Sequence, residues 1–421
     1  MKQRIADVRV RPIAFRDPPL LNVNGVHERF ALRSVIEIET EGGHVGLGES
    51  YGDLTTLADL NAAAPRLVGN DIFDLNALAR ICAETVPPHL MPGKNFPPDN
   101  SNRRIAVATG AFEVAMLDLQ GQVLGRPLCD ILGGACRARV PYSAYLFYKF
   151  ARHRDDPNPG PDPFGEALTP EGIVAQARWM GQEFGFGSIK LKGGVFAPEE
   201  EIAALRALRA AFPKSPLRID PNGGWTVSTT LRVLPQLAGL IEYLEDPVRT
   251  LGEMGEIAKT ASMPLATNMV TVAFGHIPET LRLGAVQVIL SDHHYWGGLR
   301  ATQQLAHMAR VFGLGVSMHS NSHLGITLAA MTHVAASIPN LAYACDTHYP
   351  WALDEVIEGG KLRFEAGSLA PPPGPGLGVR LDRAALKALH ALYLSCGIRV
   401  RNDEAEMRKY QPEWSGKLPR F

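Results

Sequence analysis

The stretch Ser188-Ile189-Lys190-Leu191-Lys192 is a short apolar run that ends on lysines, and it belongs to a pattern that recurs through the middle of the chain. Each repeat has an apolar run, a polar or charged residue, and then a helical stretch. The runs are Ser188–Leu191, Leu217–Ile219, Leu240–Leu244, Met263–Ala266, Val286–Leu290, Leu314–Met318 and Leu341–Ala344. Their spacing of roughly 25 residues suits a strand, a helix and two short loops. We therefore expect an α/β fold, a (β/α)7-8 TIM-like barrel over residues 138–368.

A doubly wound open sheet is the structural alternative, because it is also built from strand–helix repeats. Such sheets commonly carry a glycine-rich phosphate-binding fingerprint after the first strand, and none is found here. Seven runs in a row without hairpin turns favour the barrel.

The first 137 residues have a different rhythm, in which strands come first and helices follow. We expect an α+β capping domain here, with two unpatterned loops that either cover a substrate or are plain surface loops. Residues 369–421 begin with a Pro-rich linker, continue with a helix that Asp382 caps, and are expected to return to this domain. The predicted elements are strands at Val8–Ala14, Ala31–Glu39 and His44–Glu49, helices at Leu57–Leu67, Ile105–Leu124 and Asp382–Leu394, and loops at Leu20–Arg29 and Pro87–Asn102.

Charge and composition exclude several classes of function. The chain has 42 Lys+Arg against 43 Asp+Glu, so it has no excess of positive charge for nucleic acid or anionic lipid. No apolar run approaches the ~18 residues of a membrane helix, and the charged start MKQRIADVRVRP is unlike a signal peptide. Five scattered cysteines fit reduced thiols. We expect a cytoplasmic protein with a small-molecule substrate and no nucleic-acid or membrane partner.

Oxygen ligands end three successive runs: Asp220, Glu245 and Asn268. Strand ends converge on one mouth of a barrel, so these side chains are expected to meet there. Without thiolates or imidazoles, the set favours a hard cation such as Mg²⁺. The alternative is that each acid caps a helix or pairs with a lysine.

Lys190 and Lys192 are two residues apart on one strand and so share a side of it. A second ammonium and a metal nearby would lower the pKa of a lysine, as a base near neutral pH requires. His319 beside Asp292 is a candidate for a second base, with Asp292 fixing the ring tautomer. A metal on a carboxylate makes the α-proton removable, and a Lys or His base with Mg²⁺ is the arrangement described for enolase-type enzymes. The alternatives are solvated lysines and a structural histidine.

Several motifs resemble those of the enolase superfamily, and of its glucarate dehydratase group in particular. The resemblance covers nearly the whole chain, and the pairing of Asn268 with the His-Ser-Asn triplet is its most specific part. The motifs are Asn24-Gly25-Val26-His27, Tyr145-Leu146-Phe147, Lys190-Leu191-Lys192-Gly193-Gly194, Asp220-Pro221-Asn222-Gly223, Glu245-Asp246-Pro247, Ala266-Thr267-Asn268-Met269, Asp292, His319-Ser320-Asn321, Asp346-Thr347-His348 and Pro375-Gly376-Leu377-Gly378-Val379.

The resemblance implies a role for each matching residue. Mg²⁺ would be bound by Asp220, Glu245 and Asn268. Lys192 would be one base, and His319, oriented by Asp292, the other base and the acid that expels a hydroxyl. Lys190 would hold the substrate carboxylate. The remaining substrate contacts would be His27, Tyr145, Asn222, Asn268, Ser320, Asn321 and His348. The implied reaction is dehydration of D-glucarate or L-idarate to a keto-deoxy diacid, by a cytoplasmic homo-oligomer.

Two departures from the group affect the distal end of the substrate. Where the group has a threonine in the loop Lys94–Arg103, this chain has Asn95-Phe96-Pro97-Pro98. Where a member of the group has Lys-Arg-Pro near the C-terminus, this chain has Lys417-Leu418-Pro419, with Arg420 just beyond. The stereoisomer used as substrate therefore stays open. Epimerisation or racemisation, dehydration of another acid sugar, a catalytically silent paralogue that binds a partner subunit, and a metal-free Schiff-base aldolase are the alternatives.

Overall fold

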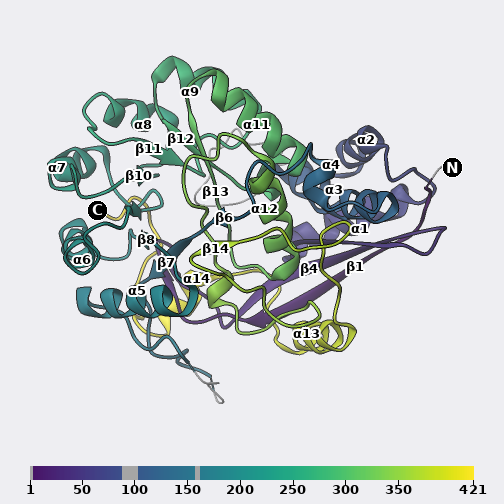
Figure 1. Ribbon diagram of the computed structural model, residues 1–421. Coiled ribbons are helices and arrows are strands. Elements are labelled where there is room, and N and C mark those ends of the chain that lie inside the picture. The colour runs from purple at the N-terminus through teal and green to yellow at the C-terminus, as the bar shows by residue number, and fades with distance from the viewer. Residues whose placement is uncertain (1–2, 88–102, 157–161) are drawn as a thin grey trace.

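The structure is a computed structural model that describes residues 3–87, 103–156 and 162–421. Figure 1 shows an antiparallel sheet with helices at one side and a barrel wrapped by helices at the other. Of the loop predicted at Pro87–Asn102, only Pro87 is among the described residues, and the rest lies outside them.

The antiparallel sheet has the strand order β1-β4-β5. Its strands are β1 (Ile5–Arg16), β4 (Phe30–Thr40) and β5 (Val45–Tyr51). Between β1 and β4 the chain forms a small hairpin, β2 (Leu21–Asn22) and β3 (Gly25–Val26), in the segment expected to be a loop. The three strands predicted for this part of the chain are confirmed.

Helices cover this sheet and join it to the barrel. Both helices predicted in this region are confirmed, and α2 is an additional helix that was not predicted. The helices are α1 (Leu54–Leu67), α2 (Leu75–Thr85), α3 (Arg103–Leu124) and α4 (Leu128–Ile131). Helix α3 packs closely on β5, where Gly46 and Gly48 let the backbone of α3 approach: a Cβ at either glycine would lie within 2.4 Å of an α3 carbonyl oxygen.

The second sheet is parallel and has seven strands in the order β13-β12-β11-β10-β9-β8-β7. The seventh predicted run, Leu341–Ala344, follows β13 and closes the barrel through single bridges, from Leu341 to Val316 on one side and from the next residue, Cys345, to Tyr142 on the other. The predicted α/β barrel with an α+β cap is therefore confirmed. Its strands are β7 (Ser143–Phe147), β8 (Ser188–Lys192), β9 (Leu217–Asp220), β10 (Tyr243–Glu245), β11 (Leu265–Thr267), β12 (Val288–Ser291) and β13 (Gly315–Met318).

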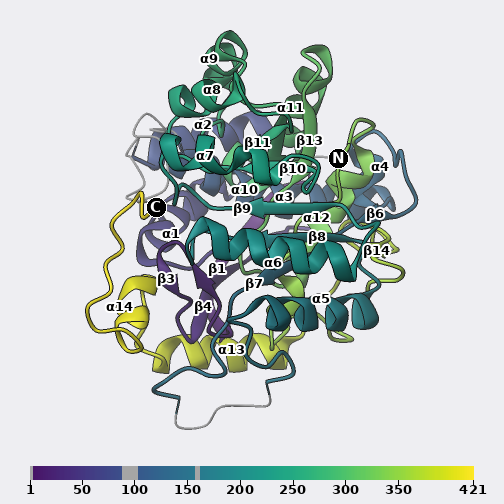
Figure 2. The same cartoon turned by 90° about the vertical axis from the view of Figure 1, so that its left-hand side faces the viewer.

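Helices follow the barrel strands and form its outer layer (Figures 1 and 2). Every residue of α12 is buried, as expected for a helix that is apolar all round. The helices are α5 (Pro170–Phe184), α6 (Pro198–Ala211), α7 (Val227–Leu237), α8 (Leu251–Ala258), α9 (Ile277–Leu283), α10 (His293–Trp296), α11 (Leu299–Val311) and α12 (Gly325–Ser337), with 3₁₀ turns η1 (Phe274–His276) and η2 (Tyr349–Trp351).

The C-terminal part of the chain returns to the capping sheet, as predicted. After β14 (Ser368–Leu369), which pairs with β6 (Val140–Pro141), helix α13 (Arg383–Ser395) packs on β1. Helix α14 (Asp403–Arg408) lies beside β3, and Figure 2 shows the tail continuing from it toward the barrel. The domain boundaries at 137/138 and 368/369 stay predictions.

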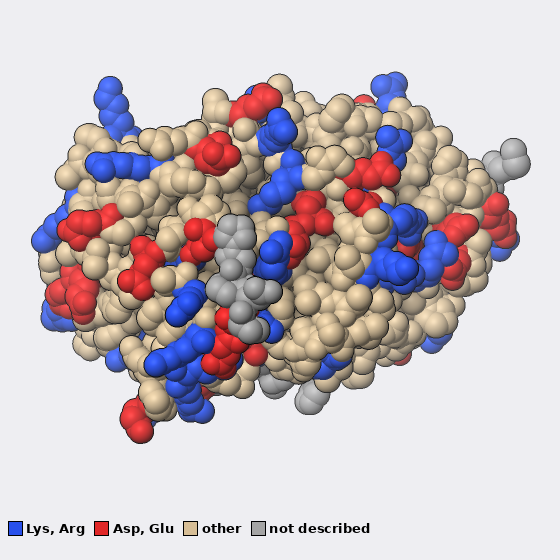
Figure 3. Space-filling view, turned by 90° about the horizontal axis from the view of Figure 1, so that it is seen from below, with Lys and Arg blue, Asp and Glu red and all other residues tan. Residues whose placement is uncertain are grey.

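The surface agrees with the balanced composition. Figure 3 shows Lys and Arg interspersed with Asp and Glu over one face. Within the described residues, none of the helices combines the length and the apolar character that a membrane crossing needs.

Candidate active site

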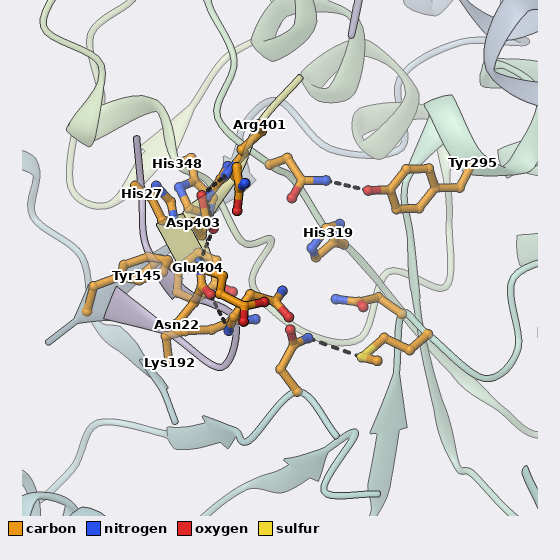
Figure 4. Close-up of a pocket in the computed structure, with 17 residues that line it drawn as sticks. Asn22, His27, Tyr145, Lys192, Tyr295, His319, His348, Arg401, Asp403 and Glu404 are labelled. Atoms are coloured by element: carbon orange, nitrogen blue, oxygen red, sulfur yellow. Dashed lines mark hydrogen bonds and ion pairs between the residues drawn. The ribbon is translucent and has the colours of Figure 1, made fainter. Parts of the chain in front are cut away.

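The ends of the barrel strands, the segment around the β2–β3 hairpin and the C-terminal segment line an open cavity of about 380 Å³. This volume is in the range of small-molecule sites. The residues that line it are Asn22, Asn24, His27, Tyr145, Phe147, Lys192, Asn222, Asn268, Met269, Tyr295, His319, Asn321, His348, Arg401, Asn402, Asp403 and Glu404 (Figure 4).

Three buried carboxylates meet beneath this cavity around Lys190. Lys190 Nζ lies 2.5 Å from Glu245 Oε2, 2.6 Å from Asp346 Oδ2 and 3.6 Å from Asp220 Oδ2. Asn268 Nδ2 donates to Glu245 Oε1 at 3.0 Å, so the three predicted metal ligands are neighbours in space. Burial and repulsion by Asp220 raise the pKa of Glu245 well above its usual range.

This cluster fits a hard divalent cation. Glu245 Oε2 is buried and accepts no hydrogen bond from the described residues, although the Lys190 ammonium lies close to it. Carboxylate and amide oxygens on three adjacent strand ends are the donors that Mg²⁺ takes, and a cation would relieve the repulsion between Asp220 and Glu245. The backbone of Asn268 is fixed by Asp246, whose Oδ2 accepts from Asn268 N at 2.8 Å.

The two lysines of β8 have different surroundings. Lys192 lines the cavity, and its Nζ lies 2.6 Å from Asp220 Oδ2. Lys190 is fully buried under the Tyr145 ring, with Nζ 4.6 Å from the ring centroid. It is not one of the described residues that line the cavity. Burial opposes its charge, but Asp346 and Glu245 more than compensate and raise the pKa of Lys190 well above its usual range. The lowered pKa is expected for the lysine that acts as a base beside a bound metal, so it stays a prediction, as does the contact of Lys190 with a substrate carboxylate.

His319 follows β13 and faces the cavity. Its Nδ1 lies 3.2 Å from Asp292 Oδ2, so Nε2 is the ring nitrogen left for a ligand. Burial, more than the opposing effect of Asp292, lowers the pKa of His319 and favours the neutral ring. The predicted Asp292–His319 pair is present, and Figure 4 shows His319 and Lys192 reaching the cavity from separate strands.

Most of the predicted substrate contacts line the cavity: His27, Tyr145, Asn222, Asn268, Asn321 and His348. The exceptions are Lys190 and Ser320, whose Oγ instead accepts from His348 N at 3.1 Å. His27 is held by Asp17, with Nδ1 and Oδ2 3.0 Å apart. The substrate roles of all these residues stay predictions.

The C-terminal segment contributes residues to the cavity that were not predicted from the sequence. Arg401 reaches the cavity, and its Nε and NH2 donate to Asp403 Oδ1 and Oδ2 at 2.6 and 2.7 Å. Asn22 Nδ2 donates to the same carboxylate at 2.8 Å. Gly25 permits this approach, because a Cβ there would lie 2.2 Å from Asp403 O. The sequence offers one signal for this contribution, the position of Arg401 directly before Asn402, the N-cap residue of α14.

Arg420, the cation beside the Lys417-Leu418-Pro419 departure, does not line the cavity. Its NH2 donates to Val23 O at 2.7 Å and its NH1 to Gly194 O at 3.4 Å. This contact ties the tail to the β2–β3 hairpin and the barrel. The arginine that the cavity contains is Arg401.

Two models of known protein families match most of the chain, and both families are consistent with the barrel, the capping domain and the site described above. Residues 172–385 match the family described as Enolase C-terminal domain-like, and residues 5–133 match the Mandelate racemase / muconate lactonizing enzyme N-terminal domain. The chain belongs to the enolase superfamily. The family resemblance seen in the sequence is thereby confirmed.

Individual relatives span the whole chain. A protein of Streptomyces coelicolor named probable glucarate dehydratase is 48% identical over 99% of each chain. A solved enolase from Pseudomonas fluorescens with bound magnesium, potassium and tartrate is 52% identical over 100% of each chain, with a TM-score of 0.97. One from Thermobispora bispora, complexed with magnesium and formate, is 49% identical over 100% of each chain, with a TM-score of 0.95. The prediction of magnesium as cofactor agrees with the metal in both structures.

Proposed function

We propose that this protein is a magnesium-dependent dehydratase of an acid sugar of the hexarate type, a carbon–oxygen lyase. One observation carries the proposal: two different bases, Lys192 and His319, reach a single cavity next to a carboxylate cluster that suits Mg²⁺. The relative named probable glucarate dehydratase and the tartrate bound to the Pseudomonas fluorescens protein support a hydroxylated diacid as substrate.

Asp220, Glu245 and Asn268 would hold the metal. Bound there, Mg²⁺ would supply positive charge that stabilises the negative charge developing on the substrate carboxylate as the α-proton leaves. Lys190, held between Asp346 and Glu245, adds a fixed positive charge below the same position.

Two side chains of the protein, Lys192 and His319, transfer the protons. Lys192 Nζ takes the α-proton of one epimer, and His319 Nε2 takes it from the other. For the epimer on which His319 acts, this proton passes from Nε2 to the β-hydroxyl as its C–O bond breaks, so that water leaves. For the epimer on which Lys192 acts, His319 begins the step as the imidazolium and donates its Nε2 proton to the β-hydroxyl, while Lys192 keeps the α-proton and later releases it to solvent. The enol that remains becomes a keto-deoxy acid by taking up a proton. Asp292, ionised and paired with His319, stabilises the imidazolium in the step where His319 carries the proton.

Arg401 would bind the distal carboxylate of the diacid. Asp403 engages its Nε and NH2, which fixes the guanidinium plane and leaves NH1 as the edge available to a ligand. Asn22 and His27 also line the cavity, where the amide nitrogen of Asn22 can donate to a hydroxyl group and His27 Nε2, the ring nitrogen that does not face Asp17, can accept from one. We further propose that the protein acts in the cytoplasm as a homo-oligomer.

A screen of all hexarate and aldonate isomers for keto-acid formation tests the proposal. With Mg²⁺ we expect a 2-keto product from at least one diacid, lost with EDTA and restored by added Mg²⁺. Deuterium uptake from D₂O without loss of water from any isomer would show an epimerase instead, which two bases on one cavity also permit. No turnover and no exchange would favour a silent paralogue, and borohydride trapping of a keto substrate would favour a Schiff-base aldolase.

A further inference from the structure

A buried side chain of the capping sheet is linked to the catalytic histidine through two residues that follow β12. Arg33, on β4, is 1% exposed, and its NH2 lies 3.1 Å from His294 Nε2. His294 Nδ1 lies 2.8 Å from Asp292 Oδ1, and Asp292 Oδ2 lies 3.2 Å from His319 Nδ1. We call Arg33, His294, Asp292 and His319 the buried hydrogen-bond chain.

The donors and acceptors in this chain have one consistent assignment. A guanidinium has only N–H groups to offer, so His294 Nε2 accepts from Arg33. The proton of the neutral His294 ring is then on Nδ1, which donates to Asp292 Oδ1. The backbone N–H of His294 donates to the same oxygen at 3.0 Å. Asp292 Oδ2 is left to accept from His319 Nδ1–H, which puts the lone pair of His319 on Nε2, the atom that faces the cavity.

The opposite tautomer of His294 is disfavoured by its surroundings. An Nε2–H could donate to Glu49 O, 3.1 Å away, but it would also point at an N–H of Arg33. Arg33 cannot turn aside, because its Nε donates to Glu49 Oε1 at 2.9 Å and its NH2 to Thr327 Oγ1 at 3.2 Å. Buried from solvent, a pair of opposed N–H groups is costly.

Asp292, His293 and His294 also have the spacing of metal ligands, since their ligand atoms lie within 4.8 Å of one another. Both oxygens of Asp292 and the Nδ1 of His294 are already used in hydrogen bonds. Two of its three members, Asp292 and His294, therefore already belong to the buried hydrogen-bond chain.

We propose that Arg33 and His294 are positioning residues that fix the tautomer of His319 through Asp292, so that the capping sheet sets which nitrogen of the catalytic ring can act as base. The kinetic consequence rests on the function proposed above, whereas the tautomer assignment does not. The groups that face His294 are Asp292 and His293 on its own element, Arg33, Glu49 and Tyr51 on the capping sheet, and His323 after β13.

Ring tautomers can be measured directly. In long-range ¹H–¹⁵N spectra of the ¹⁵N-histidine protein with Mg²⁺ at pH 8, we expect His294 and His319 each to carry a proton on Nδ1 and none on Nε2, with assignments from His294→Asn and His319→Gln. In Arg33→Met we expect His294 Nε2 to acquire a proton and donate it to Glu49 O. An Nε2 proton on His294 or His319 in the unsubstituted protein, or no change in Arg33→Met, would overturn the proposal whatever the substrate.

A matched pair of variants tests the effect on turnover and does not require the removal of buried Arg33. His294→Asn keeps an N–H near the Nδ1 position for Asp292, whereas His294→Leu, of similar size, has none. We expect kcat for water loss to fall about 10- to 100-fold in His294→Leu, as for other residues that orient a reactive group, with KM little changed and with recovery in His294→Asn. Exchange of the substrate α-proton for deuterium by Lys192 in D₂O should persist in both variants.

Thr327→Val is the control, because it removes one anchor of Arg33 and leaves the contact with His294. We expect its kcat to stay within about threefold of the unsubstituted protein. Equal kcat values for His294→Leu and His294→Asn would contradict the proposal, and so would an equal loss of α-proton exchange by Lys192 and by His319. Either result would show that His294 acts only through packing. A wild-type protein inactive on every isomer, but with the expected tautomers, would contradict the proposed function only.

Discussion

Lys192 Nζ lies 2.6 Å from Asp220 Oδ2, so the proposed base is bonded to a proposed ligand of the metal. A cation that binds Asp220 would compete with Lys192 for the same oxygen and free the amine to act on a substrate. This relationship connects metal binding to the availability of the base.

The first prediction concerns Lys192→Arg. Arginine keeps the ion pair with Asp220 but cannot lose its proton near neutral pH, so it cannot act as a base. We expect kcat for the epimer whose α-proton faces Lys192 to fall by about 10²- to 10⁴-fold. Mg²⁺ binding should be retained, and loss of metal affinity together with activity would show a structural role instead.

Metal binding should be visible as stability. Because Glu245 is buried with Asp220 and Asp346, neutralising their repulsion should stabilise the folded state, and a ligand at 100 times its Kd adds about 2.7 kcal/mol. We expect Mg²⁺ to raise the Tm and EDTA to reverse the rise. In Glu245→Gln the Tm should no longer respond to Mg²⁺, whereas Glu242→Gln, at the other end of β10 from the cavity, should respond normally. Equal responses would remove Glu245 from the metal site.

Arg401→Met should separate diacids from monoacids. The KM for a hexarate should rise at least tenfold, because a charged hydrogen bond to the distal carboxylate is lost, while turnover of an aldonate, which lacks that carboxylate, should change little. Lys409→Met removes a cation from the same segment that pairs with Asp155 and Glu406, and serves as the control. A parallel loss with both substrates would contradict a role for Arg401 at the distal end.

Buried histidines should make the fold sensitive to acid. Burial lowers the pKa of His323 and of His333 to about 4, below the ~6.5 of an unfolded chain. The unfolded state therefore binds protons first, so their contribution to stability is complete above about pH 6.5 and is lost as the pH falls toward 4. Each contributes up to about 3 kcal/mol. Urea unfolding should show a lower free energy of unfolding at pH 5 than at pH 7.5, and the difference should be smaller in His333→Gln. An identical pH dependence in the two proteins would show that His333 does not contribute to it.

The sequence predicted the barrel and most of the cavity because both depend on local regularities. Apolar runs at a regular spacing mark the strands, and the polar residues that end them reach one mouth by geometry alone. Lys190 and Lys192 share a side of β8, but which of them lies deeper depends on Tyr145 and Asp346, from distant parts of the chain.

Arg401 and His294 could not be assigned in the same way. Arg401 belongs to a polar segment without periodicity, and its position depends on a close approach to Gly25. His294 reads as an ordinary residue of α10, a short helix, and only contact with Arg33 of the capping sheet shows its connection to His319. Contacts between distant segments leave no pattern in the local sequence.

The most direct test of the two-base account is mass spectrometry of substrate and product after incubation of His319→Gln with an active hexarate and Mg²⁺ in D₂O. We predict that recovered substrate gains one deuterium beside a carboxylate through Lys192 while no keto acid forms, because the acid that expels the hydroxyl is missing. Keto acid formed at the rate of the unsubstituted protein, or recovered substrate without deuterium, would contradict it.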